Sequence, residues 1–245
     1  MTMADDDQWD FYPCRIDEYE AAILLNLRYD GQPPPAAATT LYRVRVPMRE
    51  PDEHGMGTPA EAGGMNELEE AIVKALGELR YVGRIRSRAD WELVFYGAPG
   101  LAAEIQSIRD VFADRRTYLD VRPDPDWAYY REFLLPDDER RRWMHDRRLT
   151  DVLGKDGESL ATPRRVDHWA HFTTAETRDR FVDAATEAGF TLQRAAEVTG
   201  KPLPFGAQLY REDAVDLEHI HDVAMQLVEL ATGLGGTYEG WDTLD

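Results

Sequence analysis

The spacing of apolar residues divides the chain into short strands and a few amphipathic helices. Residues 8–48 predict three strands: a short aromatic-rich stretch from Trp9 to Ile16, and two stretches, 23–29 and 42–48, in which apolar side chains recur at every second position. The proline- and glycine-rich residues 49–65 are expected to form a loop, and Asn66 with Glu69 three positions later predicts a capped helix start. Further along the chain, the spacing of apolar residues predicts a helix over 66–79 and a hairpin of strands over 81–87 and 91–97. It then predicts a helix over 101–112 and a strand over 117–122.

Residues from 166 onward predict a second and more regular order of elements. A strand ends at Thr173, which is expected to cap a helix that stops at Gly189, and two strands follow over 190–198 and 204–211. A long helix then begins at Asp216, and its buried stripe is expected to contain Leu217, Ile220, Ala224, Leu227, Ala231 and Leu234. The closing residues return as a last strand. The order β-α-β-β-α-β is the split βαβ, or ferredoxin-like, arrangement.

These two patterns predict a two-domain α+β protein. We assign residues 5–135 to the first domain, an antiparallel sheet covered by two helices, and residues 164–245 to a ferredoxin-like second domain. The residues between them, 136–163, contain a mixed charge run followed by a small, polar stretch. They are expected to be a helical or flexible linker.

Negative charge dominates both parts of the chain. The formal net charge is −19, which divides into −9 for residues 1–150 (20 Lys and Arg against 29 Asp and Glu) and −10 for residues 151–245 (8 against 18). Such a field repels nucleic-acid backbones and favours encounter with a basic protein. Solubility alone is the other explanation of the acidity.

Length and composition predict a cytoplasmic protein of bacterial type. No apolar run approaches the ~18 residues of a membrane span, and the acidic N-terminus differs from a basic signal peptide. The single cysteine, Cys14, excludes an internal disulfide and a multi-cysteine metal site. We therefore expect no association with a membrane.

Catalytic motifs do not stand out in the sequence, so we expect neither enzymatic activity nor a cofactor. Four histidines fall in the second domain, but they do not form convergent pairs. His168 and His171 should point to opposite faces of a strand, and His219 and His221 should lie about 200° apart on a helix. A metal site is therefore not expected.

RNA binding is an alternative for the second domain, because RNA-recognition domains share its order of elements. Such a domain stacks bases on aromatic side chains beside Arg or Lys, and near the strand that begins at Phe205 only Arg211 is available. The charge of −10 opposes RNA further. Protein binding ranks above RNA binding, and no direct nucleic-acid contact is expected.

Several short motifs give the second domain a recognisable signature. They are His171-Phe172-Thr173, Ala188-Gly189-Phe190, Phe205-Gly206, Asp216 and the closing Gly236-Thr237-Tyr238-Glu239-Gly240-Trp241-Asp242-Thr243. Over roughly residues 160–245, this set resembles the RraB family, the protein inhibitors of ribonuclease E activity. The resemblance implies a ferredoxin-like fold, an acidic surface and binding to the scaffold region of the ribonuclease instead of to RNA.

The first domain has a weaker signature of its own. It consists of Trp9-Asp10-Phe11-Tyr12, the helix over 66–79, Tyr81-Val82-Gly83-Arg84 and the aromatic strand from Trp91 to Tyr96. These stretches resemble a second bacterial family, domain-of-unknown-function family 695. That resemblance implies no activity.

Candidate contact residues lie on the long helix and the last strand of the second domain. Glu218, Asp222 and Glu229 are expected to contact a basic protein partner, which the resemblance identifies with the ribonuclease E scaffold. Strand alternation places Tyr238 and Trp241 on opposite faces, so one should be buried, preferably Trp241, and the other exposed as a contact. A bulge at Gly240 would change that geometry.

The function predicted is therefore that of a non-catalytic, acidic regulator of a ribonuclease E-type enzyme. Two alternatives remain open. One is an immunity- or antitoxin-like inhibitor of another basic protein, and the other is an enzyme or small-molecule binder with a site between the domains.

Overall fold

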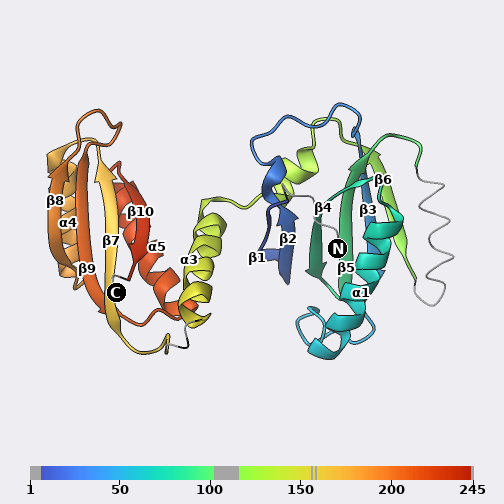
Figure 1. Cartoon of the computed structure of the whole chain (residues 1–245), viewed down its shortest axis with the longest axis horizontal. Helices are drawn as coiled ribbons and strands as arrows, with labels where there is room; N and C mark the ends of the chain where they lie inside the picture. The colour runs from blue at the N-terminus through green and yellow to red at the C-terminus, as the bar shows by residue number, and fades with distance from the viewer. Residues whose placement is uncertain (1–6, 102–115, 156, 158, 244–245) are drawn as a thin grey trace. The chain divides into compact units, whose positions relative to one another are not determined.

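The computed structural model describes residues 7–101, 116–155, 157 and 159–243 (Figure 1). The chain divides into two compact units, Met1–Arg140 and Arg141–Asp245. Each unit contains a β-sheet with helices, so the predicted two-domain α+β class is confirmed. Within the described ranges, no helix is both long and apolar enough to cross a membrane.

The first unit is built on a six-stranded sheet in which neighbouring strands are antiparallel, as predicted. The strand order across the sheet is β1-β2-β4-β5-β3-β6. The strands lie close to the predicted positions: β1 Trp9–Ile16, β2 Tyr19–Asn26, β3 Thr40–Pro47, β4 Arg80–Ser87, β5 Asp90–Gly97 and β6 Tyr118–Pro123.

Helix α1 (Pro59–Ala75) covers one face of this sheet and begins earlier than predicted. Its N-cap is Thr58, whose hydroxyl accepts a hydrogen bond from the backbone N–H of Glu61. Asn66 lies inside the helix, so the helix start expected there is wrong. Proline suits the first turn of a helix, because its missing N–H would have no helical partner there. The second predicted helix, 101–112, lies outside the described residues except for its first residue.

Glu69 is buried between α1 and the sheet instead of supporting a helix start. Its carboxylate accepts hydrogen bonds of 2.8 Å from the Tyr81 hydroxyl and the Trp91 indole N–H. The guanidinium of Arg84 donates to the same carboxylate, also at 2.8 Å. A buried carboxylate needs such partners to offset the loss of its hydration. Polar contacts therefore tie α1 to β4 and β5 in addition to apolar packing.

The segment that follows β6 covers the other face of the first sheet. Tyr96 neighbours Phe95 in β5 and therefore points to this other face. Its ring stacks on Trp127 with 4.1 Å between the ring centroids, and the Trp127 indole donates to the carbonyl of Ala38 at 2.7 Å. A short π-helix, η2 (Tyr129–Leu134), continues the cover. The aromatic residues of this segment thus complete the core of the first unit.

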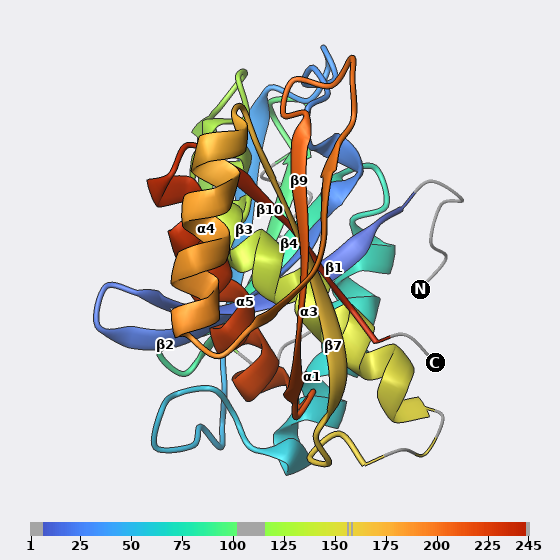
Figure 2. The ribbon, with the colours of Figure 1, turned by 90° about the vertical axis from the view of Figure 1, so that its left-hand side faces the viewer.

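The second unit has a four-stranded antiparallel sheet in the order β10-β7-β9-β8. Both helices, α4 and α5, lie on the same face of it (Figure 2). The first and third strands of the unit are central, which is the predicted ferredoxin-like arrangement. The elements run β7 Arg164–Phe172, α4 Ala175–Glu187, β8 Thr191–Glu197, β9 Phe205–Asp213, α5 Leu217–Gly233 and β10 Thr237–Asp242.

Helix α3 (Asp138–Lys155) occupies most of the segment that was expected to be a linker. The boundary between the two units falls inside this helix, after Arg140. From there on α3 packs against the second unit. Arg142 donates to the backbone carbonyls of Tyr238 and Glu239 in β10, both at 3.1 Å. The larger part of α3 is therefore a structural element of the second unit.

Candidate protein-binding surface

Helix α5 is anchored to the sheet by one stripe of its surface. Asp216 caps it, accepting a hydrogen bond from the backbone N–H of His219, as predicted for this position. The apolar residues at helical spacing are buried against the sheet: Ile220, Val223, Ala224, Leu227 and Ala231. Because that stripe faces inward, the side chains about half a turn away must face outward.

The outward face of α5 is acidic. Glu218, Asp222 and Glu229 are all exposed, and at about 100° per residue they lie within about 40° of one another around the helix. The helix contains no Lys or Arg. Across the part of the chain that the structure describes, these three carboxylates have no ion-pair partner. Their negative charge is therefore available to a partner.

A shallow hollow of about 750 Å³ lies along the same face of α5. Its lining is mainly apolar around Met225 and Val228, with small residues at the C-terminal end of the helix. Two of the carboxylates flank it. The full lining consists of Asp222, Met225, Gln226, Val228, Glu229, Thr232 and Gly233. We call this surface, together with Glu218, the α5 outer face.

The two aromatic candidates, Tyr238 and Trp241, are both buried, each with 4% of its surface exposed. The expectation that one of them would be exposed is wrong. The pairing of β10 with β7 shifts register between Tyr238 and Gly240, so Glu239 is an extra residue in the strand. Such a bulge interrupts the alternation of faces, and both aromatic side chains turn toward the helices. Neither side chain is placed to contact a partner directly.

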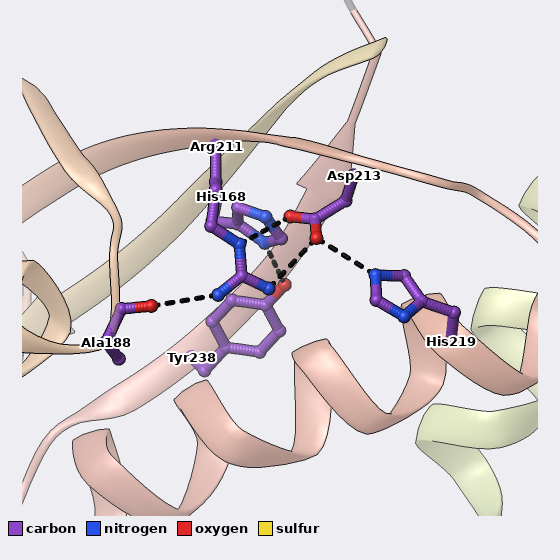
Figure 3. A network of polar contacts seen from close by, with 6 residues as sticks. All are labelled: His168, Ala188, Arg211, Asp213, His219 and Tyr238. Atoms are coloured by element: carbon purple, nitrogen blue, oxygen red, sulfur yellow. Dashed lines mark hydrogen bonds and ion pairs between the residues drawn. The ribbon is translucent and has the colours of Figure 1, made fainter. Parts of the chain in front are cut away.

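Tyr238 contributes to a buried polar network beneath α5 (Figure 3). Its hydroxyl lies 2.9 Å from Nδ1 of His168, which belongs to the neighbouring strand β7 and is 1% exposed. The pKa of His168 is lowered to about 4, mainly by burial, with Asp213 opposing the decrease and Arg211 adding to it. Burial also raises the pKa of the Tyr238 hydroxyl. Both groups are therefore neutral near pH 7.

Asp213 is the charged centre of the same network (Figure 3). Arg211 donates to both of its carboxylate oxygens, at 2.8 and 3.0 Å, and Nε2 of His219 lies 2.9 Å from Oδ1. Burial alone would raise the pKa of Asp213, but hydrogen bonds from Arg211 and His219 outweigh it, and the pKa is lowered. Arg211 also donates to the carbonyl of Ala188 at 3.0 Å. The network thus connects β9 to the first turn of α5 and to the end of α4.

Trp241 holds helix α3 in place through a second buried carboxylate. Asp146 of α3 is 0% exposed and accepts a hydrogen bond of 2.9 Å from the Trp241 indole N–H. Nδ1 of His221, on α5, lies 2.8 Å from its other oxygen. Helix α3 therefore meets α5 and β10, which are distant from it in sequence, at Asp146.

Sequence reasoning did not identify Asp146 or Asp213 as important. Asp213 follows Arg211 by two positions on a strand, which places both on one face and was a usable signal. Asp146 lies in a helix crowded with charged residues and gave no comparable signal. His168, His171, His219 and His221 have separate surroundings, and within the described ranges no cluster of His, Cys, Asp or Glu could hold a metal ion.

Comparison with known proteins supports both predicted resemblances. Residues 143–243 match the family described as Regulator of ribonuclease activity B, and residues 7–135 match the family of unknown function DUF695. No curated protein matches the chain. Among solved structures, one described as a glycine cleavage system transcriptional repressor covers 84% of this chain and 99% of its own, at 10% identity and a TM-score of 0.27. That similarity is too low to support an argument.

The match over residues 7–135 spans more than half of the 245 residues. The chain therefore belongs to the family of unknown function DUF695, and its C-terminal region carries the match to Regulator of ribonuclease activity B.

Proposed function

We propose that this protein is a non-catalytic regulator that binds a ribonuclease E-type enzyme in the cytoplasm through the α5 outer face. The family match supports regulation of a ribonuclease. The observation that carries the assignment to this surface is the set of three exposed carboxylates on one face of α5, which have no ion-pair partner among the described residues and lie beside an apolar hollow. A surface of this kind is suited to a basic protein segment.

Charge favours a protein partner over RNA. Residues 141–245 contain 19 Asp and Glu against 12 Lys and Arg, a difference of −7. RNA affinity depends on cations that displace counterions from phosphates, and α5 has none. Regulation by protein contact needs no bound RNA and no reacting group on the regulator.

The buried networks support this function by fixing the position of α5. The Asp213 network holds its first turn, and the contact between His221 and Asp146 holds the next one. A surface that is already ordered loses less conformational entropy on binding, which favours affinity. The predicted contacts Tyr238 and Trp241 therefore act indirectly, through the packing of α5 and α3.

The direct test is the rate at which a purified ribonuclease E-type enzyme from the same source cleaves a fluorogenic RNA. We expect the full chain to slow cleavage, and the triple variant Glu218→Lys, Asp222→Lys, Glu229→Lys to lose most of that effect. Exposed ion pairs contribute about 0.2–1 kcal/mol each, so the loss of three should weaken binding by about 0.6–3 kcal/mol, which is between ~3-fold and ~150-fold. The salt dependence of binding should also become shallower.

Helix α4 supplies a matched control. Its residues Glu176, Asp183 and Glu187 are also exposed, and one of them, like Glu218, lies in the first turn of its helix. Reversing these three gives the same change in net charge. Equal loss of regulation in both triple variants would mean that only the overall charge matters, and it would remove the assignment to α5.

A pull-down from native lysate with the full chain separates the wider alternatives. Recovery of a ribonuclease E-type enzyme supports the proposal. Recovery of a different basic protein, lost with the α5 triple variant, would support the immunity-like alternative and contradict the ribonuclease assignment.

A further inference from the structure

We infer that the α5 outer face binds an amphipathic helix of the partner, with Lys or Arg side chains beside an apolar stripe. This inference rests on the proposed function and adds the form and chemistry of the partner segment. Its basis is the arrangement of charge, apolar surface and small residues along α5.

The position and the lining of the hollow along α5 are suited to contact with a second helix. It is lined only by α5 residues, and it follows one side of the helix from Asp222 to Gly233. Asp222, Met225, Glu229 and Thr232 are separated by three, four and three positions, which is the spacing that a packed helix pair uses for its contact seam. Met225 offers a flexible apolar contact in the middle of this seam.

The negative charge of α5 determines which kind of partner helix can bind to it. Asp222 and Glu229 are seven residues apart, which is about 10 Å along the helix axis. A facing helix places side chains one heptad apart at the same separation, so two cations at that spacing can meet both carboxylates. Glu218 lies one turn before Asp222 and extends the acidic stripe. The adjacent helix α4 interleaves its acids with Arg178 and Arg180, so it does not present the same uniform charge.

Small residues at the C-terminal end of α5 allow close approach. A Cβ placed on Gly233 would meet no atom within 4 Å, so the space in front of this residue is open. Interhelical distances depend on the size of the contacting side chains, and a glycine permits the shortest. The structure thus leaves room where a second helix would cross.

The other end of α5 is already covered by helix α3 of the same unit. At that end Thr150 and Gly154 face Leu217, and Asp146 contacts His221. Helix α3 therefore covers the first turns of α5. The hollow from Asp222 to Gly233 is the part of the α5 surface that remains accessible.

The test uses two labelled peptides of about 18 residues, which is five helical turns. Both contain the same Leu, Ala, Gln and Arg residues. In one, arginines flank a leucine stripe at heptad spacing, and in the other the order is scrambled to remove the stripe. Binding to the full chain is followed by fluorescence anisotropy, with helix formation followed by circular dichroism. We expect the striped peptide to bind at least ~10-fold more tightly and to become helical on binding.

Two variants locate the binding site. Gly233→Trp fills the open space and should reduce binding of the striped peptide at least ~10-fold, whereas Glu187→Trp adds the same side chain to the exposed surface of α4 and should not. A striped peptide with glutamates in place of its arginines should bind only to the double variant Asp222→Lys, Glu229→Lys. Such a charge exchange would show direct contact.

The outcomes separate this inference from the proposed function. Equal affinity of the two peptides, or binding that is unchanged in Gly233→Trp, would overturn the helix inference even if the α5 triple variant had lost regulation of the ribonuclease. If the striped peptide binds to α5 as a helix but the triple variant still regulates the ribonuclease, the helix inference would be supported and the proposed function would be overturned.

Discussion

The buried imidazole of His168 should make the second unit less stable in mildly acidic solution. In the folded protein this side chain is 1% exposed, and burial lowers its pKa from the ordinary value of 6.5 to about 4. In the unfolded chain the imidazole takes up a proton as the pH falls below its ordinary pKa, whereas in the folded chain it remains neutral until about pH 4. The unfolded state therefore binds more protons in this interval, and stability decreases as the pH is lowered.

The size of the effect follows from the two pKa values. One pKa unit corresponds to about 1.4 kcal/mol, so the complete transition lowers the free energy of unfolding by about 3 kcal/mol. At pH 5 the same relation gives a loss of about 2 kcal/mol relative to neutral pH. The groups facing His168 limit the usable range. Asp213 and Asp167 have lowered pKa values, so their contributions are present above the ordinary carboxyl pKa and are lost only at lower pH. The measurement therefore belongs between about pH 4.5 and 7.

Fluorine NMR of protein labelled with 5-fluorotryptophan can follow each unit separately. Three of the six tryptophans belong to the second unit, namely Trp143, Trp169 and Trp241, and the other three belong to the first. Urea titrations at a series of pH values give the free energy of unfolding of the second unit. In His168→Gln, which keeps a polar group for Tyr238, most of the decrease between pH 7 and 4.5 should disappear. His145 retains a smaller contribution of the same sign, because half burial and then Arg142 lower its pKa.

A core variant separates the pH effect from simple destabilisation. Leu209 is paired with His168 across β7 and β9 and is 1% exposed. Leu209→Ala should lower stability by about 2–5 kcal/mol at every pH and leave the pH dependence of the natural protein intact. If His168→Gln and the natural protein lost the same free energy between pH 7 and 4.5, the protonation argument would be refuted.

The same spectra test three further predictions about buried charges. Arg211→Met removes the main partner of buried Asp213 and should destabilise the second unit by about 3 kcal/mol. A loss below ~1 kcal/mol would show that His219 alone is enough to stabilise the Asp213 carboxylate. Asp146→Ala leaves the indole N–H of Trp241 without its acceptor and should cost about 2–3 kcal/mol. Asp146→Asn, which keeps an acceptor, should cost less. Glu69→Ala should lower the urea midpoint of the first unit, through its lost hydrogen bonds, and leave the second-unit resonances unchanged. A shift of both midpoints would mean that the two units unfold together.

Local patterns predicted most of the fold because each sheet has a simple alternation. The strands of the first unit and all six elements of the ferredoxin-like arrangement were expected close to their observed positions. The start of α1 was missed because prolines and glycines dominate the sequence before Asn66, although Thr58-Pro59 is itself a good helix start. Proline is usually read as a residue that interrupts a helix. Only its position in the first helical turn shows that it can also begin one.

Tertiary contacts account for what the sequence left out. Only part of α3 is buried, and Met144, Asp146 and Thr150 are scattered among charged residues, so the helix looked like a linker. Its role depends on a hydrogen bond to Trp241, about a hundred positions later, which no local periodicity contains. The exposure of Tyr238 was misjudged for a related reason, because one bulged residue in β10 changes which face the next side chain occupies.

The most specific sequence motif of the second unit determines its fold more than its choice of partner. Within Gly236 to Trp241, Tyr238 contacts His168 of β7 and Trp241 contacts Asp146 of α3, so both contacts stabilise the fold. The residues proposed to meet the partner, Glu218, Asp222 and Glu229, lie outside that motif. A protein can therefore keep the motif and the fold while changes on α5 alter the partner. Substitutions in the motif should lower stability first and binding in consequence. Substitutions on the outer face should lower binding while the unfolding free energy stays within about 1 kcal/mol, because exposed charges contribute little to folding.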